Sequence, residues 1–111
     1  MTTTTIDLAT YEELKEAAGS DFVAELVGTF LEEAPTLLAE LRAAQAEAAD
    51  DRFRRAAHTL KTNALTFGAT VLGEQARALE LGGLPAETAA LEALEATYAE
   101  AAAALEVLRH G

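Results

Sequence analysis

Apolar residues recur along this chain at alternating spacings of three and four, and this periodicity most restricts what the chain can fold into. Such spacing puts apolar side chains on one face of an α-helix and does not match the strict alternation of a β-strand. The sequence therefore predicts an all-α protein. The expected helices are a short one over Tyr11–Ala18, then 21–48, 51–67, 70–81, and a last helix that begins near Pro85.

Capping and helix-breaking residues give the expected ends of these helices. Thr10, with Glu13 three residues on, resembles a capping box for the first helix, and Ser20 is a plausible cap for the second. Asp50 or Asp51 can cap the third helix.

Glycine and proline give the remaining boundaries. Gly68 is expected to end the third helix, and the Gly82–Gly83 pair the fourth. Pro35 predicts a kink or a break in the second helix, because proline removes one backbone hydrogen bond. Pro85 suits the first turn of the last helix.

The connections between the four longer segments are short, which favours an antiparallel four-helix bundle. The short first helix would cover one end of it. We expect a single domain over residues 1–111, with residues 1–8 as a flexible leader. The inward stripe of the third helix is predicted as Phe53, Ala57, Leu60, Ala64 and Phe67.

Net charge excludes several classes of partner. The chain carries 19 acidic and eight basic residues, a formal net charge of −11, and a pI of about 4.4. A phosphate backbone or an anionic membrane surface would repel it, so we expect no nucleic-acid or membrane partner. The N-terminus lacks the features of a signal peptide, and no apolar run is long enough for a membrane span. We therefore expect a cytoplasmic protein, monomeric by default.

Few residues in the chain could carry chemistry. There is no cysteine, Ser20 is the single serine, and no glycine-rich phosphate loop is present. The two histidines, His58 and His110, lie far apart in the sequence, so no metal site is expected.

His58 falls off the apolar stripe of the third helix, on the flank that should face solvent. Arg54, Lys61, Thr62 and Leu65 lie three, four or seven residues away and so share its side of the helix. An exposed imidazole with an ordinary pKa near 6.5 offers a neutral, nucleophilic nitrogen at cellular pH.

The surroundings of His58 in the sequence are basic. Half of the eight Lys and Arg residues occur within 52–61, and no Asp or Glu occurs between Asp51 and Glu74. This local positive island predicts an anionic ligand, with phosphate as the natural candidate. The alternative is a solvated basic face, or one paired with acids of a neighbouring helix.

The run Ala57-His58-Thr59-Leu60-Lys61-Thr62, continuing to Gly68, resembles the signature of histidine-containing phosphotransfer domains. That signature is an acceptor histidine, an apolar residue two on, lysine three on, a small residue four on and glycine ten on. The resemblance extends to the segments before and after it and covers nearly the whole chain. It implies a four-helix bundle with the acceptor histidine exposed in the middle of a helix.

The resemblance also implies roles for single residues. His58 would be the phosphoacceptor, and Lys61 would neutralise the phosphoryl group. Arg54, four residues before His58 on the same side of the helix, is expected from its position to help in this neutralisation. Glu80 matches a position whose polar side chain orients the imidazole. A receiver domain would dock over Arg55, Thr62 and Leu65. The sequence departs from the family at Thr62, where many members have glycine, so partner choice or transfer rate should differ.

The mechanism implied is reversible phosphoryl transfer between receiver domains of response regulators or hybrid histidine kinases. The receiver supplies Mg²⁺, so no cofactor is expected in this chain. A chain of 111 residues leaves no room for an ATP-binding kinase domain, so we expect a phosphocarrier that cannot charge itself. Two alternatives remain open. One is a non-catalytic interaction module that uses the Arg54–Leu65 face. The other is a domain excised from a larger kinase.

Overall fold

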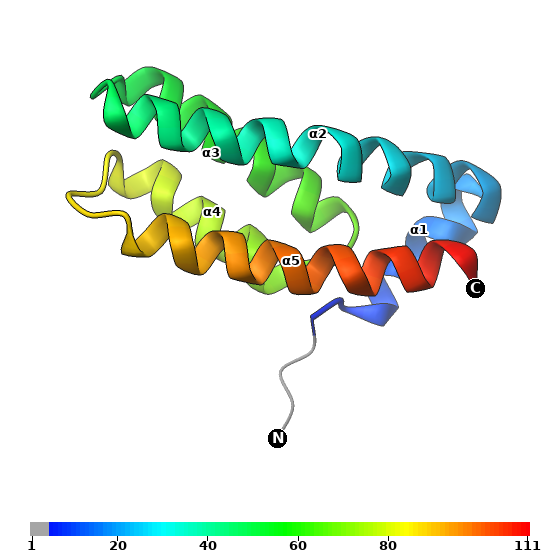
Figure 1. Ribbon diagram of the computed structural model, residues 1–111. Helices are drawn as coiled ribbons and strands as arrows, with labels where there is room; N and C mark the ends of the chain where they lie inside the picture. The colour runs from blue at the N-terminus through cyan, green and yellow to red at the C-terminus, as the bar shows by residue number, and fades with distance from the viewer. Residues whose placement is uncertain (1–4) are drawn as a thin grey trace.

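The computed structural model describes residues 5–111, and those residues form five α-helices and no strand (Figure 1). The prediction of an all-α fold is confirmed. The helices are α1 (Leu8–Ala18), α2 (Ser20–Ala46), α3 (Asp50–Thr66), α4 (Thr70–Gly82) and α5 (Ala89–His110).

Each of the four longer helices packs against two others. α3 lies between α2 and α4, and α5 contacts the same two helices from the other side. The four helices therefore surround one core. α1 packs against α2 and α3, near the end of the molecule where α5 finishes (Figure 1).

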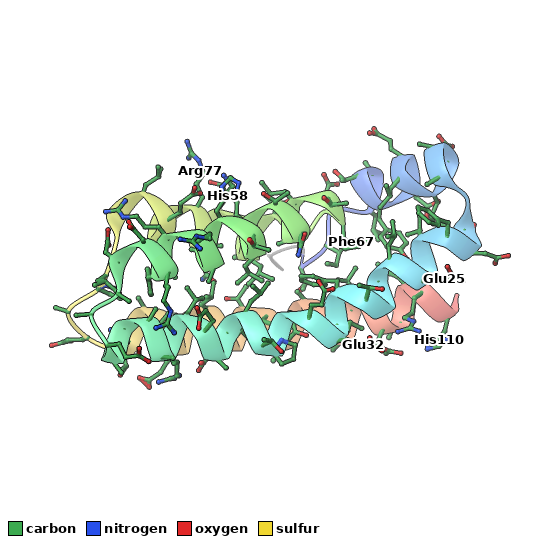
Figure 2. All side chains as sticks on the ribbon, turned by 90° about the horizontal axis from the view of Figure 1, so that it is seen from above. Glu25, Glu32, His58, Phe67, Arg77 and His110 are labelled. Carbon is green, nitrogen blue, oxygen red and sulfur yellow. The ribbon has the colours of Figure 1, made fainter. Side chains whose placement is uncertain are left out.

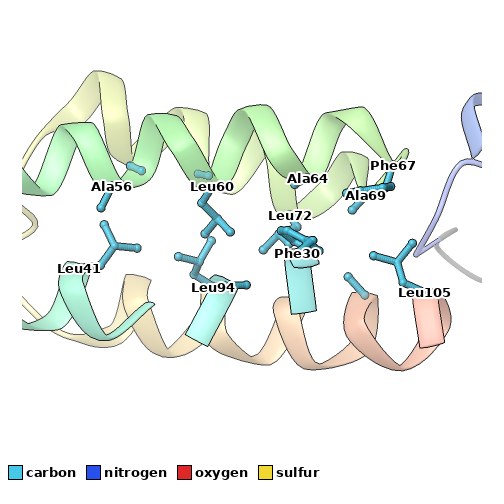
Figure 3. Packing of buried hydrophobic residues seen from close by; sticks show 14 of the residues in the cluster. Phe30, Leu41, Ala56, Leu60, Ala64, Phe67, Ala69, Leu72, Leu94 and Leu105 are labelled. Carbon is cyan, nitrogen blue, oxygen red and sulfur yellow. The ribbon is translucent and has the colours of Figure 1, made fainter. Parts of the chain in front are cut away.

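The core is built from the apolar stripes that the sequence shows. All five residues predicted to face inward from α3 are buried, and Leu60 is 0% exposed. Figure 3 shows Leu41, Leu60 and Leu94 turned toward the interior between the helices. The apolar stripes of the other long helices are less complete at their edges, where one residue is exposed and several are partly exposed. Ala48 is the exposed one, and Leu37, Leu79, Tyr98 and Leu108 are half-buried.

α1 begins three residues earlier than predicted, and its capping residue differs. Asp7 is the N-cap: its carboxylate accepts hydrogen bonds from the Ala9 amide (3.2 Å) and from the Thr10 hydroxyl (2.8 Å). The capping box at Thr10 and Glu13 was wrong. The reason is tertiary, because Ile6 is buried in the core and brings the chain into the fold before Thr10 is reached.

The same segment corrects the expected flexible leader over 1–8. Residues 1–4 lie outside the described residues, but Ile6 and Asp7 belong to the folded domain. The Asp7 amide donates to the Gly68 carbonyl (2.7 Å) in the turn between α3 and α4. Gly68 has a φ of +83°, and a Cβ there would lie 2.7 Å from the Asp7 carbonyl oxygen. Glycine is therefore needed at position 68 both to end α3 and to admit the N-terminal segment.

The remaining differences concern helix ends. α2 begins at Ser20 itself and runs without a break through Pro35. Proline removes one backbone hydrogen bond there, and the packing of α2 on α3 and α5 offsets that loss, so the helix continues. Ala49, not Asp50 or Asp51, is the N-cap of α3. α5 begins at Ala89, so Pro85 lies in the preceding loop, where its carbonyl accepts a hydrogen bond from Gln45 (3.0 Å).

Truncating the core of α3 should destabilise the protein strongly. Leu60→Ala removes a fully buried side chain, and we expect it to lower the free energy of unfolding by about 2–5 kcal/mol. Urea denaturation followed by circular dichroism measures this. The matched control is Leu81→Ala, the same truncation at a side chain that is 64% exposed, with an expected loss below about 0.5 kcal/mol. Equal losses for the two variants would contradict the assigned core.

Candidate functional site

His58 projects from the outer face of α3, as the sequence predicted. Its side chain is 56% exposed, whereas its neighbours Ala57 and Leu60 are completely buried. Figure 2 shows the imidazole on the outside of the bundle, above the space between α3 and α4. The ring is therefore open to another protein while its helix remains anchored in the core.

One carboxylate, that of Glu80 on α4, joins His58 to Lys61. His58 Nδ1 lies 2.8 Å from Glu80 Oε2, and Lys61 Nζ lies 3.1 Å from Glu80 Oε1. The contact between Lys61 and Glu80 is an ion pair, but its angles are not those of a hydrogen bond. Lys61, and then His58, hold the pKa of Glu80 below its ordinary value despite the opposing effect of partial burial.

The Glu80 contact determines which imidazole nitrogen can react. An ionised carboxylate only accepts hydrogen bonds, so the neutral ring carries its proton on Nδ1 and donates it to Glu80. The lone pair is then on Nε2, at the exposed edge of the ring. In its neutral form the ring therefore turns the Nε2 lone pair outward, away from Glu80.

Close packing of α4 on α3 makes this contact possible. Leu65 of α3 lies directly over Gly73 of α4, and a Cβ at Gly73 would collide with its side chain. The absence of a side chain at position 73 lets the two helices approach. Glu80, two turns further along α4, is thereby brought to the level of His58.

Arg54 has other partners than the imidazole. Its guanidinium bonds Asp50 (2.8 Å) and donates to the backbone carbonyl of Glu80 (2.9 Å). It also packs over Gly83 at the end of α4. Arg54 thus ties the start of α3 to the end of α4 and holds the backbone that carries Glu80.

Three of the four cations in the basic island around His58 are paired with acids. Arg52 bonds Glu40 (2.9 Å), which lies within α2, and Glu47 (2.7 Å), which follows its last residue. Lys61 pairs with Glu80 and Arg54 with Asp50. The sequence showed the absence of acids within 52–73, but it could not show which acids pack against that segment.

The residues expected to contact a partner are exposed on the same helix. Arg55 and Thr62 are exposed, and Leu65 is 38% exposed where it covers Gly73. Among the described residues Arg55 makes no ion pair, and it lines a shallow groove with Leu37 of α2 and Thr59. His58 therefore lies between a cationic rim and a small apolar surface.

Arg77 was not singled out from the sequence, yet its side chain projects on the same side of the bundle as His58 in Figure 2. It is on α4, three residues before Glu80, and therefore on the same helical face. Its side chain is 57% exposed, and its ion pair with Glu74 is loose at 4.0 Å. The signal that could have found it is this spacing from Glu80.

Comparison with known families decides the class of this site. The family model described as Hpt domain matches residues 25–104, which include His58, Lys61, Arg77 and Glu80. The chain belongs to the Hpt domain family. Neither the curated proteins nor the solved structures contain a match to it.

Hpt domains carry out histidine phosphotransfer in phosphorelays, where they interact with receiver domains of response regulators. They are phosphocarriers, and the matched Hpt segment fills most of this chain. Within residues 5–111, no three histidine or carboxylate side chains are grouped to hold a metal ion. In the same range, no helix is both long enough and apolar enough to cross a membrane.

Replacing the exposed imidazole should have little effect on the stability of this Hpt domain. His58→Gln keeps a side chain able to hydrogen-bond Glu80, so we expect the free energy of unfolding to change by less than about 1 kcal/mol. Urea denaturation at neutral pH measures it. A loss as large as that expected for Leu60→Ala would show that His58 is a structural residue.

The lowered pKa of Glu80 predicts a pH-dependent contribution to stability. A carboxyl whose pKa falls on folding stabilises the protein above its unfolded pKa, and that stabilisation is lost as pH falls through the folded value. The destabilisation caused by Glu80→Gln should therefore be largest near neutral pH and shrink below the ordinary glutamate pKa of 4.5. Denaturation across pH 3–7 tests this, with Glu16→Gln, an exposed site on α1, as the control. A pH-independent difference would contradict the assigned contact.

Proposed function

We propose that this Hpt domain accepts a phosphoryl group on His58 from the phospho-aspartate of a receiver domain and passes it to a second receiver. The observation that carries the proposal is the contact between His58 Nδ1 and Glu80. It leaves Nε2 as the nucleophile at the exposed edge of the ring.

The transfer step follows from this tautomer. The Nε2 lone pair attacks phosphorus in line, the bond between phosphorus and the aspartyl oxygen breaks, and the aspartate leaves as a carboxylate. Nδ1 keeps its proton, and the Glu80 carboxylate offsets the positive charge that develops on the ring. The reverse step, with the carboxylate of another receiver as the nucleophile, discharges the protein. Mg²⁺ belongs to the receiver.

Lys61 is the cation assigned to the phosphoryl oxygens. It is one helical turn from His58, and its contact with Glu80 is an ion pair of poor hydrogen-bond direction. The Lys61 ammonium can therefore turn toward a phosphoryl group without breaking a well-aligned hydrogen bond to Glu80. The contribution of Arg54 to phosphoryl neutralisation is indirect, because its guanidinium is held by Asp50 and by the Glu80 carbonyl.

The docking surface is assigned to the exposed side chains that flank His58. Leu65 provides apolar area, Arg55 an unpaired cation for the acidic pocket of a receiver, and Thr62 the site of closest approach. Thr62 is larger than the glycine that many Hpt domains have at this position, so the receiver domains that can approach His58 closely should differ from theirs.

The proposal includes a monomeric protein in the cytoplasm without nucleic-acid or membrane partners, consistent with its net charge of −11.

The arrangement proposed for the fold is the antiparallel four-helix bundle expected from the short connections. It is supported by the packing of α2, α3, α4 and α5 around one core and by the reversal of chain direction between successive helices in Figure 1. This arrangement keeps the middle of α3 rigid while it presents His58.

Transfer of labelled phosphate tests the function directly. A radiolabelled phospho-receiver with Mg²⁺ is mixed with the wild type or with His58→Gln, and the label on each protein is measured. We expect label on the wild type alone, and we expect it to be labile in acid and stable in base, as a phosphoimidazole is. Complete loss of transfer in His58→Gln should accompany retained receiver binding in a pull-down assay.

The competing function is a non-catalytic interaction module that uses the Arg54–Leu65 face. It predicts receiver binding to both proteins and label on neither. Label of equal amount on wild type and His58→Gln would place the acceptor elsewhere. Either result would overturn the proposal.

A further inference from the structure

The cations near His58 differ in how firmly they are held. Lys61 is 21% exposed and paired with Glu80 at 3.1 Å, and Arg54 is bonded to Asp50 and to backbone carbonyls. Arg77 is 57% exposed, and its one ion pair, with Glu74, is 4.0 Å long. Moving the Arg77 guanidinium therefore breaks no close hydrogen bond.

Arg77 also lies on the correct side of the molecule. It precedes Glu80 by three residues on α4, and Glu80 contacts the His58 ring. In Figure 2 the labelled side chains of Arg77 and His58 project outward on the same side of the bundle. The view agrees with the packing of α4 against α3. A long, flexible arginine at this position can reach the outer edge of the imidazole.

We propose that Arg77 is the second cation of the phosphorylated state and moves from Glu74 onto the phosphoryl oxygens carried by His58 Nε2. The inference rests on the proposed function and adds a residue to that site. A guanidinium stays charged at cellular pH and can donate two parallel hydrogen bonds to a phosphoryl group. Lys61, held between the phosphoryl group and Glu80, supplies only part of the compensating charge.

This role predicts a preference for the phosphorylated form. Glu74 is itself 60% exposed, so it returns to water when Arg77 leaves it. An added ion pair at an exposed site contributes up to about 1 kcal/mol, which corresponds to roughly a fivefold change in an equilibrium constant. Removing Arg77 should therefore reduce the share of phosphoryl groups on His58 by about three- to fivefold.

Phosphoramidate is the probe, because it phosphorylates histidine without a receiver and so separates phosphoryl contact from docking. Nε2 attacks phosphorus, the phosphorus–nitrogen bond of phosphoramidate breaks, and ammonia leaves. The variants are Arg77→Ala, and Arg77→Lys, which keeps the charge. The control is Arg42→Ala, which removes the same charge from the α2–α5 side, where Arg42 pairs with Glu95 (2.7 Å).

Two readouts follow. The first is the level of phosphohistidine at equilibrium, which we expect to fall in Arg77→Ala, recover partly in Arg77→Lys and stay unchanged in Arg42→Ala. The second is the ³¹P chemical shift of phosphohistidine as a function of pH. A nearby cation favours the dianion, so losing Arg77 should raise the phosphoryl pKa, an effect that a purely structural residue would not produce.

The outcomes separate the two proposals. A wild type that takes no phosphoryl group on His58 would overturn the proposed function together with this inference. A phosphorylated wild type with the same phosphohistidine level and the same ³¹P titration in Arg77→Ala and Arg42→Ala would overturn the inference alone. Circular dichroism of each variant checks that it is folded.

Discussion

The carboxylate of Glu80 is the contact on which the histidine face depends. It contacts His58 Nδ1 with one oxygen and faces the Lys61 ammonium with the other, so it favours the proton of the neutral ring on Nδ1 and pairs with the neighbouring cation. Its place at the ring requires close packing of α4 on α3, which Gly73 permits beneath Leu65. A Cβ at position 73 would collide with the side chain of Leu65, which would have to shift, and the close contact between the two helices would be disturbed.

Electrostatics near the site is a balance between local basic residues and a strongly acidic molecule. The chain carries a net charge of −11, yet α3 around His58 is rich in arginine and lysine. Folding brings acids of other segments against two of these cations, Arg52 and Lys61, and Arg54 pairs with Asp50 of α3 itself. Among residues 5–111, Arg55 makes no ion pair, and Arg77 has a loose one with Glu74 at 4.0 Å. The folded surface is thus less positive than the sequence of α3 suggests, and its available charge is concentrated in two arginines.

The residues of the core could be predicted from local periodicity, whereas several helix ends could not. The stripe from Phe53 to Phe67 was predicted in full because a helix of fixed period puts those residues on one face. The start of α1 at Leu8 was missed because burial of Ile6 determines it. The late start of α5 was missed because Pro85 serves a loop in which its carbonyl meets Gln45. Caps and loops depend on partners distant in the sequence, and local signals do not show them.

The sequence by itself determined the helical class, the inward face of each long helix and the exposure of His58, because all three depend on spacings within a single helix. It also indicated the Hpt family through the residues that follow His58. The tertiary structure alone decided which atom of Glu80 meets which ring nitrogen, which cations are already paired, and that Arg77 projects on the same side of the bundle as the imidazole. The physical reason is distance along the chain: these partners are on different helices, and only the packing of α3 against α4 brings them together.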